Sequence, residues 1–374
     1  MSEKRREEGL HTGKHEEGLR AERREEAPRR RKNKKKKMSV GKMILLDLLA
    51  IAVGLVVFAL FHHVLHFEKA PEPVVLATLA PQPSAEPTST PEPSAEPAAP
   101  EQSEEPAAPE ETPEPVRVYS GMWGEKFADK FTDGEIIRTE NSYRSANVNI
   151  TVTKVEEELL IYYVADIYIS DLRYLASSFA HGEYNGGIEP LADMAKEAGA
   201  IVGISGDHYY GRYEGMVVRN GVLYRDTRFQ DVCVLLSDGT MVTMTNAEMD
   251  IDNVKAAAPY QVWSFGPELL DDEGKAMTSF NSIVIPKNPR SAIGYVEPGH
   301  YYFVVVDGRI PASRGMTMQE LSQLFEDLGC TSAYNLDGGQ SSGFTWVGEL
   351  MSYPYGRNVS DLIYIWDDAA ESEG

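Results

Sequence analysis

The chain has 374 residues, of which 36 are Lys or Arg and 58 are Asp or Glu, so its formal net charge is −22. Such an acidic chain is a poor general partner for nucleic acid or for an anionic membrane surface, because both repel it. The sequence has only two cysteines and contains no CxxC, HExxH or P-loop motif, which excludes the common zinc-ribbon, metalloprotease and nucleotide-binding signatures.

The first two segments predict a membrane anchor. Residues 1–42 contain 16 Lys or Arg and few apolar residues, which is typical of a disordered basic arm. Residues 43–65 are largely apolar and, at about 1.5 Å per helical residue, long enough to cross a hydrocarbon core of about 30 Å. We therefore predict a single transmembrane helix at 43–65. A cleaved signal peptide is the alternative, but no small-x-small cleavage site follows.

The rest of the chain is predicted to lie outside the cell, because the basic flank keeps the amino terminus in the cytoplasm. Residues 66–115 are rich in Pro, Glu and Ala and repeat Pro-Ser-Ala-Glu-Pro at 83–87 and 93–97. Proline stiffness and charge repulsion predict an extended linker without a core. Residues 116–374, with 19 basic and 38 acidic residues, are the predicted globular domain.

The pattern of apolar residues predicts an α+β, or mixed α/β, domain. Strand-like runs at 148–155 and 159–170 precede a helix at 189–199 and a strand at 200–205, and the Asn-Gly and Asp-Gly pairs at 220–221 and 238–239 are typical of hairpins. A strand at 301–306, a helix that begins with a capping box, and a strand at 331–335 predict a β-α-β unit with parallel strands. The predicted fold is a single β-rich mixed-sheet domain containing this unit.

Three acidic residues follow apolar runs and adjoin a glycine: Asp207, Asp307 and Asp337. Because parallel strands end at the same edge of a sheet, the β-α-β unit predicts that Asp307 and Asp337 lie beside one another. Arg290 and Arg309 follow similar runs, and arginine suits a two-pronged grip on phosphate or carboxylate. Taken one by one, such an acid is more often a turn former than a catalyst, and such an arginine is somewhat more often part of a surface or structural ion pair than a ligand contact.

The stretch 335–342 places Asp337 next to groups that can bind an anion or a sugar. Two adjacent glycines let the backbone approach a ligand closely and present its N–H groups. Hydroxyl groups follow directly. These candidates are Gly338, Gly339, Ser341 and Ser342.

The order of the motifs resembles a known family. The motifs include Gly206-Asp207-His208, Asn288-Pro289-Arg290-Ser291, Asp307-Gly308-Arg309 and Asn335-Leu336-Asp337-Gly338-Gly339, with Arg357 further along. From about residue 142 to residue 366 the chain resembles the phosphodiester glycosidase family, named for N-acetylglucosamine-1-phosphodiester alpha-N-acetylglucosaminidase, and looks like a bacterial membrane-anchored member. The resemblance implies an extracellular hydrolase that cleaves between a sugar's anomeric carbon and a phosphate, in surface polysaccharide, wall polymer or glycoconjugate.

The resemblance also implies roles for the matching residues. A carboxylate stabilises the oxocarbenium-like transition state, a second one activates water, and arginine steadies the departing phosphate. Ser205 stands where the family usually has Asn, and Gln340 stands where a third glycine is common. The predicted catalytic residues are Asp337, Asp307 and Asp207, and the predicted substrate-binding residues are Arg290, Arg309, His208, Gly338, Gly339, Ser341, Ser342 and Arg357.

Two other functions remain open from the sequence. One is a tethered, non-catalytic glycan-binding module. The other is a metal-dependent phosphodiesterase with the aspartates as calcium or magnesium ligands, and a divalent cation would be the cofactor in that case. Cys233 and Cys330 are predicted to be buried free thiols, with a disulfide as the alternative if their Cα atoms lie within about 7 Å. The sugar, its anomer, the aglycone and the oligomeric state stay open.

Overall fold

The computed structural model describes residues 41–42, 48–53, 73–79 and 121–371. The chain forms two units, Met1–Glu68 and Lys69–Gly374. In the first unit residues 41–42 and 48–53 are helical, and the remainder of the predicted transmembrane segment 43–65 lies outside the described residues, as do residues 1–40 of the basic arm. Among the described residues no helix is both long and apolar enough to cross a membrane.

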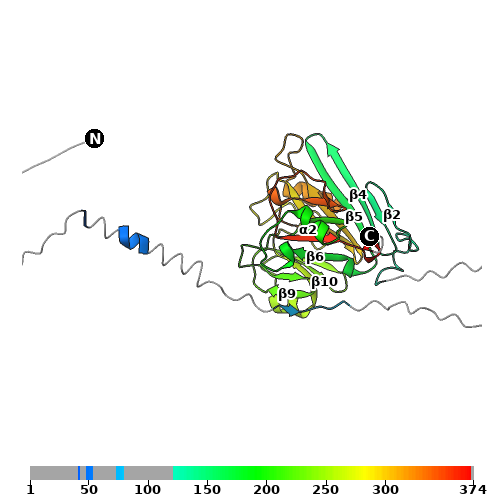
Figure 1. The fold of residues 1–374 in the computed structure, drawn as a ribbon, viewed down its shortest axis with the longest axis horizontal. Coiled ribbons are helices and arrows are strands. Elements are labelled where there is room, and N and C mark those ends of the chain that lie inside the picture. The colour runs from blue at the N-terminus through cyan, green and yellow to red at the C-terminus, as the bar shows by residue number, and fades with distance from the viewer. Residues whose placement is uncertain (1–40, 43–47, 54–72, 80–120, 372–374) are drawn as a thin grey trace, which may run out of the picture. The chain divides into compact units, whose positions relative to one another are not determined.

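The second unit is built from three sheets, in which every pair of neighbouring strands is antiparallel. The long hairpin of β4 (Val148–Glu157) and β5 (Leu160–Ile169) is the pair of long blue-green strands that carry these labels in Figure 1. The first sheet has the order β1 (Val74–Val75), β9 (Val222–Arg225), β8 (Val217–Arg219), β12 (Pro259–Trp263), β10 (Val232–Leu236), β11 (Met241–Met244). The second has the order β15 (Ser332–Asn335), β13 (Arg290–Glu297), β14 (His300–Val306), β5 (Leu160–Ile169), β4 (Val148–Glu157), β3 (Ser142–Arg144), β2 (Ile137–Arg138). The third has the order β17 (Glu349–Leu350), β16 (Phe344–Trp346), β7 (Val202–Ser205), β18 (Asp361–Ile365), β6 (Leu175–Phe179).

The second unit contains few helices beside these sheets, which agrees with the predicted β-rich domain. The capping box predicted at the start of α4 is present, because Thr317 Oγ1 accepts from the Glu320 N–H while Glu320 accepts from the Thr317 N–H. The apolar face of α4 packs against β13 and β14. The helices are α2 (Leu191–Glu197), α3 (Ile251–Ala256), α4 (Met318–Asp327) and α5 (Asp368–Glu371), with 3₁₀ turns η1 (Leu172–Tyr174), η2 (Ala180–Gly182) and η3 (Gly339–Ser341).

The predicted mixed sheet is wrong, because β13 is inserted between the two strands of the β-α-β unit. β13 pairs antiparallel with β14 on one side and with β15 on the other. β14 and β15 therefore run parallel to each other, as predicted, but they are not neighbours. Their ends lie two strand spacings, or about 10 Å, apart.

Part of the predicted linker 66–115 belongs to the domain: residues 73–79 pack on it, and the rest of the linker lies outside the described residues. Strand β1 pairs with β9, and the N–H groups of Leu76 and Ala77 donate to the Gly221 carbonyl at 2.7 and 3.1 Å. Leu76 and Leu79 pack against apolar clusters of the domain. Gly221 has a φ of +80°, and a Cβ there would lie 2.2 Å from the Ala77 carbonyl oxygen, so this contact requires glycine. The domain therefore includes a segment that precedes residue 80.

One core joins the three sheets. Its largest cluster contains Ile167 of β5, Ile363 of β18 and Trp263 of β12, one strand from each sheet. Cys233 and Cys330 are buried free thiols, as predicted, and the disulfide alternative is wrong. Burial raises the pKa of both thiols, that of Cys330 to about 12, so neither is a thiolate near neutral pH.

Candidate active site

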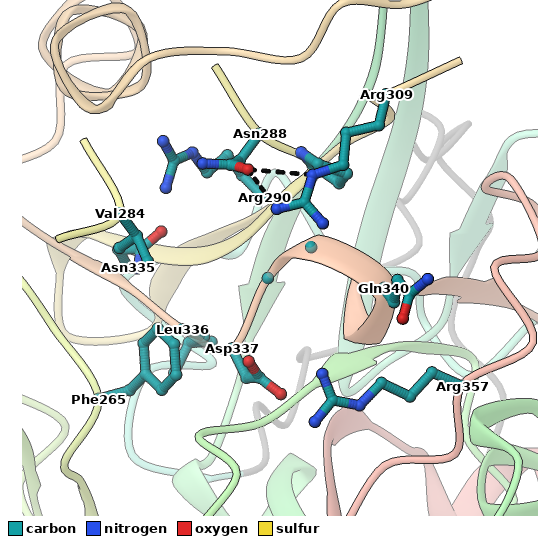
Figure 2. Close-up of a pocket in the computed structure, with 13 residues that line it drawn as sticks. Phe265, Val284, Asn288, Arg290, Arg309, Asn335, Leu336, Asp337, Gln340 and Arg357 are labelled. Carbon is teal, nitrogen blue, oxygen red and sulfur yellow. Dashed lines mark hydrogen bonds between the residues drawn. The ribbon is translucent and has the colours of Figure 1, made fainter. Parts of the chain in front are cut away.

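A pocket of about 170 Å³ opens where the turn after β15 meets four other segments. The turn supplies Asp337, Gly338 and Gly339, and Figure 2 shows the side chains that surround it. The wall is completed by the segment before β13, the turn after β14, the end of β12 and the segment before β18. The lining residues are Phe265, Val284, Asn288, Pro289, Arg290, Arg309, Asn335, Leu336, Asp337, Gly338, Gly339, Gln340 and Arg357.

Asp337 is fixed in the pocket by its backbone. Its N–H donates to the Gly206 carbonyl at 3.0 Å, and its carbonyl accepts from Ser205 Oγ at 3.3 Å. Only 13% of its side chain is exposed, and this burial raises the pKa of the carboxyl group above its ordinary value. Asp337 is therefore an oriented, largely desolvated carboxylate.

His208 stands beside this carboxylate. Its Nδ1 lies 3.9 Å from Asp337 Oδ2, too far for a hydrogen bond. Burial lowers the pKa of His208, and the positive charges of Arg212 and Arg357 lower it further, so the imidazole is neutral at pH 7. The contact is thus a neutral base next to a carboxylate, rather than a charged ion pair.

Arg290 and Arg309 form a cationic end of the pocket. Arg290 is 2% exposed and donates to the carbonyls of Met316 (3.0 Å), Ile285 (3.3 Å) and Pro286 (2.6 Å). No carboxylate of the described residues accepts a hydrogen bond from it. Burial, followed by the like charge of Arg309, lowers the pKa of Arg290 to about 10. The negative charge of Glu320 opposes this shift without reversing it. A buried cation whose hydrogen bonds all go to carbonyl groups is costly, which suggests that a ligand supplies an anion.

Arg309 and Arg357 lie on opposite sides of the turn that carries Asp337 (Figure 2). Arg309 Nε donates to Asn288 Oδ1 at 3.1 Å, and its guanidinium lies over Gly339. Arg357 is exposed, points toward Asp337 in Figure 2, and makes no ion pair within the described part of the chain. The pocket therefore has one end with two arginines and one end where an arginine faces a carboxylate.

Asp207 does not line the pocket, although a catalytic role was predicted for it. Its Oδ1 accepts from Arg219 Nη2 at 2.8 Å and its Oδ2 accepts from the Ser264 N–H at 2.8 Å. The same Arg219 nitrogen donates to Asp361 Oδ2 at 2.9 Å, and all three side chains are at most 2% exposed. With both oxygens engaged away from solvent, Asp207 fits a role in holding the Ser264 segment.

Asp307 does not join Asp337 in the pocket either, contrary to the prediction that the two lie beside one another. β13 separates their strands, and its first residue, Arg290, pairs with Val306. Asp307 is 3% exposed, its Oδ1 accepts from the Tyr353 N–H at 2.9 Å, and burial raises the pKa of its carboxyl group. Its position gives it contact with the backbone rather than with a ligand in the pocket.

Residues 198–366 match the sequence model of the phosphodiester glycosidase family. These residues belong to the phosphodiester glycosidase family. The matched region contains Asp337, His208 and the arginines of the pocket. The predicted family is thereby confirmed.

Individual relatives cover only part of the chain. It is 34% identical over 185 residues to the SPbeta prophage-derived uncharacterized protein YomE of Bacillus subtilis, which is 47% of this chain and 28% of that protein. Over 83 residues, 22% of this chain and 16% of each relative, it is 32% and 34% identical to N-acetylglucosamine-1-phosphodiester alpha-N-acetylglucosaminidase of Mus musculus and Bos taurus. The chain thus spans less than a third of the length of these relatives.

A solved structure is also similar. The catalytic domain of zebrafish N-acetylglucosamine-1-phosphodiester alpha-N-acetylglucosaminidase, auto-inhibited by its pro-peptide, aligns with a TM-score of 0.47 at 22% identity. The alignment covers 59% of this chain and 83% of that one.

The structure shows where Ser205 and Gln340, the two departures from the phosphodiester glycosidase pattern, lie relative to the pocket. Ser205 is buried, and its hydroxyl bonds Ser291 Oγ at 2.8 Å and the Asp337 carbonyl, so it helps to fix the turn. Gln340 lines the pocket directly, where a glycine would leave more room. Of the other predicted residues, Gly338 and Gly339 line the pocket, whereas the buried residues Ser341 and Ser342 do not.

The sequence analysis missed several residues that organise the site. Asp361 and Arg219 complete the buried ion-pair network of Asp207, and Arg212 ties together backbone carbonyls behind the pocket. Arg219 directly precedes the Asn-Gly pair at 220–221 that was predicted to form a hairpin turn, but its partner Asp361 is 142 residues away and carries no local signal. No group of three or more His, Cys, Asp or Glu side chains in the described ranges is placed to hold a metal ion.

Proposed function

We propose that this protein is a hydrolase that cleaves a sugar-1-phosphodiester at the bond between the anomeric carbon and the phosphate oxygen. The observation that carries the proposal is the pair Arg290 and Arg309, which forms no ion pair with a carboxylate among the described residues and shares a pocket with Asp337. Paired arginines suit the oxygens of a phosphate, and a buried carboxylate suits the positive charge that develops on a sugar ring. Family membership supports the same reaction.

We assign separate roles to the residues that line the pocket and to His208, which lies beside Asp337 but does not itself line the pocket. Arg290 and Arg309 bind the phosphate, while Asp337 stabilises the oxocarbenium character of the anomeric carbon. Neutral His208 accepts a proton from the attacking water, whose oxygen bonds to the anomeric carbon. The bond between the anomeric carbon and the bridging oxygen then breaks. The phosphate keeps this bridging oxygen and leaves as an anion. The water-activating role first assigned to a second carboxylate thus passes to His208.

The substrate and the location are further parts of the proposal. The names of the mammalian relatives make an N-acetylglucosamine-1-phosphodiester the first substrate to test, in a surface polysaccharide, wall polymer or glycoconjugate. The basic arm and the apolar segment 43–65 support a single-pass anchor with a cytoplasmic amino terminus and an extracellular domain.

The test is hydrolysis of methyl-phosphate diesters of sugar-1-phosphates by the full chain in detergent. We expect reducing sugar to be released and Asp337→Asn to reduce the rate by at least about a hundredfold. In ¹⁸O-labelled water the label should enter the sugar. Label in the phosphate, with loss of activity on chelation, would instead favour the metal-dependent phosphodiesterase. Binding without release from any diester would favour the glycan-binding module.

A further inference from the structure

Arg212 connects His208 to the wall of the pocket through backbone contacts. Its Nε donates to the His208 carbonyl at 2.9 Å, its Nη1 to the Ser264 carbonyl at 3.3 Å, and its Nη2 to the Asp207 carbonyl. His208 and Asp207 follow β7, whereas Ser264 follows β12 of a different sheet. One guanidinium therefore joins two segments that flank the site.

Aromatic rings hold this guanidinium in place. The Arg212 Cζ lies 4.7 Å from the centre of the Phe229 ring and 5.7 Å from that of Phe265. Phe265 lines the pocket, so Arg212 lies directly behind the pocket wall. Cation–π contacts of this kind restrict the guanidinium without neutralising it.

The backbone of His208 requires such support. Its φ is +53°, in the left-handed region, which costs a residue with a side chain about 1–2 kcal/mol. Strain of this kind persists only where the surroundings impose it, and it gathers at functional sites. The Arg212 contacts to the carbonyls of His208 and of the preceding Asp207 fix the two peptide groups that flank this strained residue.

We propose that Arg212 is the positioning residue that holds His208 in its left-handed conformation, with the imidazole directed at Asp337. This inference rests on the proposed function, because it assigns the support of the base in that reaction. Arg212 does not line the pocket and contacts none of the reacting groups, so it acts through His208.

The charge of Arg212 has a second effect on the same imidazole. No carboxylate of the described residues forms an ion pair with Arg212, so its charge is not cancelled locally. The charged groups that act on His208 are Asp337 and Asp207, which favour its protonated form, and Arg212 and Arg357, which oppose it. Removing Arg212 should therefore raise the pKa of His208 and bring part of it into the protonated, inactive form near pH 7.

The experiment compares Arg212→Ala, Arg212→Lys and the control Arg228→Ala in the full chain. Arg228 is an exposed arginine outside the pocket, so its variant should match the wild type. The pKa of His208 is followed by NMR of selectively labelled histidine, and hydrolysis is followed across pH. We expect Arg212→Ala to raise the His208 pKa, to move the acid limb of the pH–rate profile upward, and to lower kcat about tenfold or more with a smaller change in KM.

Two further measurements decide the proposal. Arg212→Lys should retain the lowered His208 pKa but recover only part of kcat, because an ammonium group cannot reproduce three guanidinium contacts. Added guanidinium should partly restore the activity of Arg212→Ala. A folded Arg212→Ala protein with an unchanged His208 pKa and pH profile would overturn the inference. The NMR titration needs no turnover, so it tests the role of Arg212 even if no sugar phosphodiester is hydrolysed. The absence of hydrolysis would refute the proposed function but not the inference about Arg212.

Discussion

Two buried arginines of this domain provide a matched comparison. Arg290 and Arg219 are each 2% exposed, but Arg219 lies between two carboxylates whereas Arg290 bonds only to carbonyl groups. Replacing each by methionine removes the charge and keeps an apolar side chain of similar length. We expect Arg219→Met to lower the free energy of unfolding and Arg290→Met not to lower it.

The structure sets the expected magnitude for Arg290→Met. Lowering the pKa of Arg290 from 12.5 to about 10 corresponds to a cost of about 3 kcal/mol for holding the charge in the folded state. Its three carbonyl partners would not be left without donors, because each accepts a second hydrogen bond. These donors are the N–H and Nδ2 of Asn288, to Met316 and Pro286, and the N–H of Met318, to Ile285. Arg290→Met should therefore leave stability unchanged or raise it by up to about 3 kcal/mol.

Arg219→Met should lower the free energy of unfolding. It leaves the carboxylates of Asp207 and Asp361 buried without a cation, and removing one partner of such a network costs about 3–5 kcal/mol. For a domain with a stability of about 5–15 kcal/mol, that is a large fraction.

The free energy of unfolding of both variants is measured by urea unfolding of a chain that begins at residue 69, with tryptophan fluorescence as the signal. Hydrolysis is measured on the same samples, and Arg290→Met should lose at least about a hundredfold in rate while remaining folded. A loss of more than about 1 kcal/mol in Arg290→Met would refute the argument that its charge is uncompensated. Wild-type activity in a stable Arg290→Met protein would remove Arg290 from the phosphate site.

Three further predictions concern pH and the first strand. Burial is the main reason that the pKa of Asp361 is raised from 3.8 to about 6 in the folded state. The folded state therefore binds this proton more tightly than the unfolded state does. As the pH rises from about 4 to about 6, loss of the proton should lower the free energy of unfolding by about 3 kcal/mol. The free energy of unfolding should therefore differ more between pH 4.5 and pH 7 in the wild type than in Asp361→Asn. An equal difference in the two proteins would contradict the raised pKa of Asp361. A chain that begins at residue 80 lacks β1 and should lose about 2–4 kcal/mol in urea unfolding relative to one that begins at residue 69, whereas equal stability would show that β1 contributes nothing. Gly221→Ala should cause a similar loss in the longer chain and a smaller one in the chain that begins at residue 80, since its Cβ would clash with Ala77.

The sequence predicted local features well where a few neighbouring residues determine them. The capping box of α4, the hairpin turns at Asn220-Gly221 and Asp238-Gly239, and the turn carrying Asp337 are all encoded within a few residues. The family motifs also identified the pocket arginines, because those residues lie in contiguous matches. Such signals survive without knowledge of the tertiary structure.

Long-range pairing was not predictable in the same way. The sequence that connects β14 to β15 does not show that the earlier strand β13 lies between these two strands in the sheet. Hydrophobic periodicity therefore could not decide whether Asp307 and Asp337 lie side by side. A buried carboxylate and an exposed one look identical in sequence, which is why Asp207 was expected in the pocket. Its burial depends on Arg219 and Asp361, which reach it from other strands.

The docking of β1 also decides what the edge of the first sheet offers to other molecules. β1 is the outermost strand on this side of the sheet and pairs only with β9. While it is bound, the outermost strand has only two residues, and so short an edge gives another chain little to pair with. When it detaches, the four residues of β9 become an open edge with free N–H and C=O groups. Loss of this segment would therefore turn a protected edge of the sheet into a template for self-association.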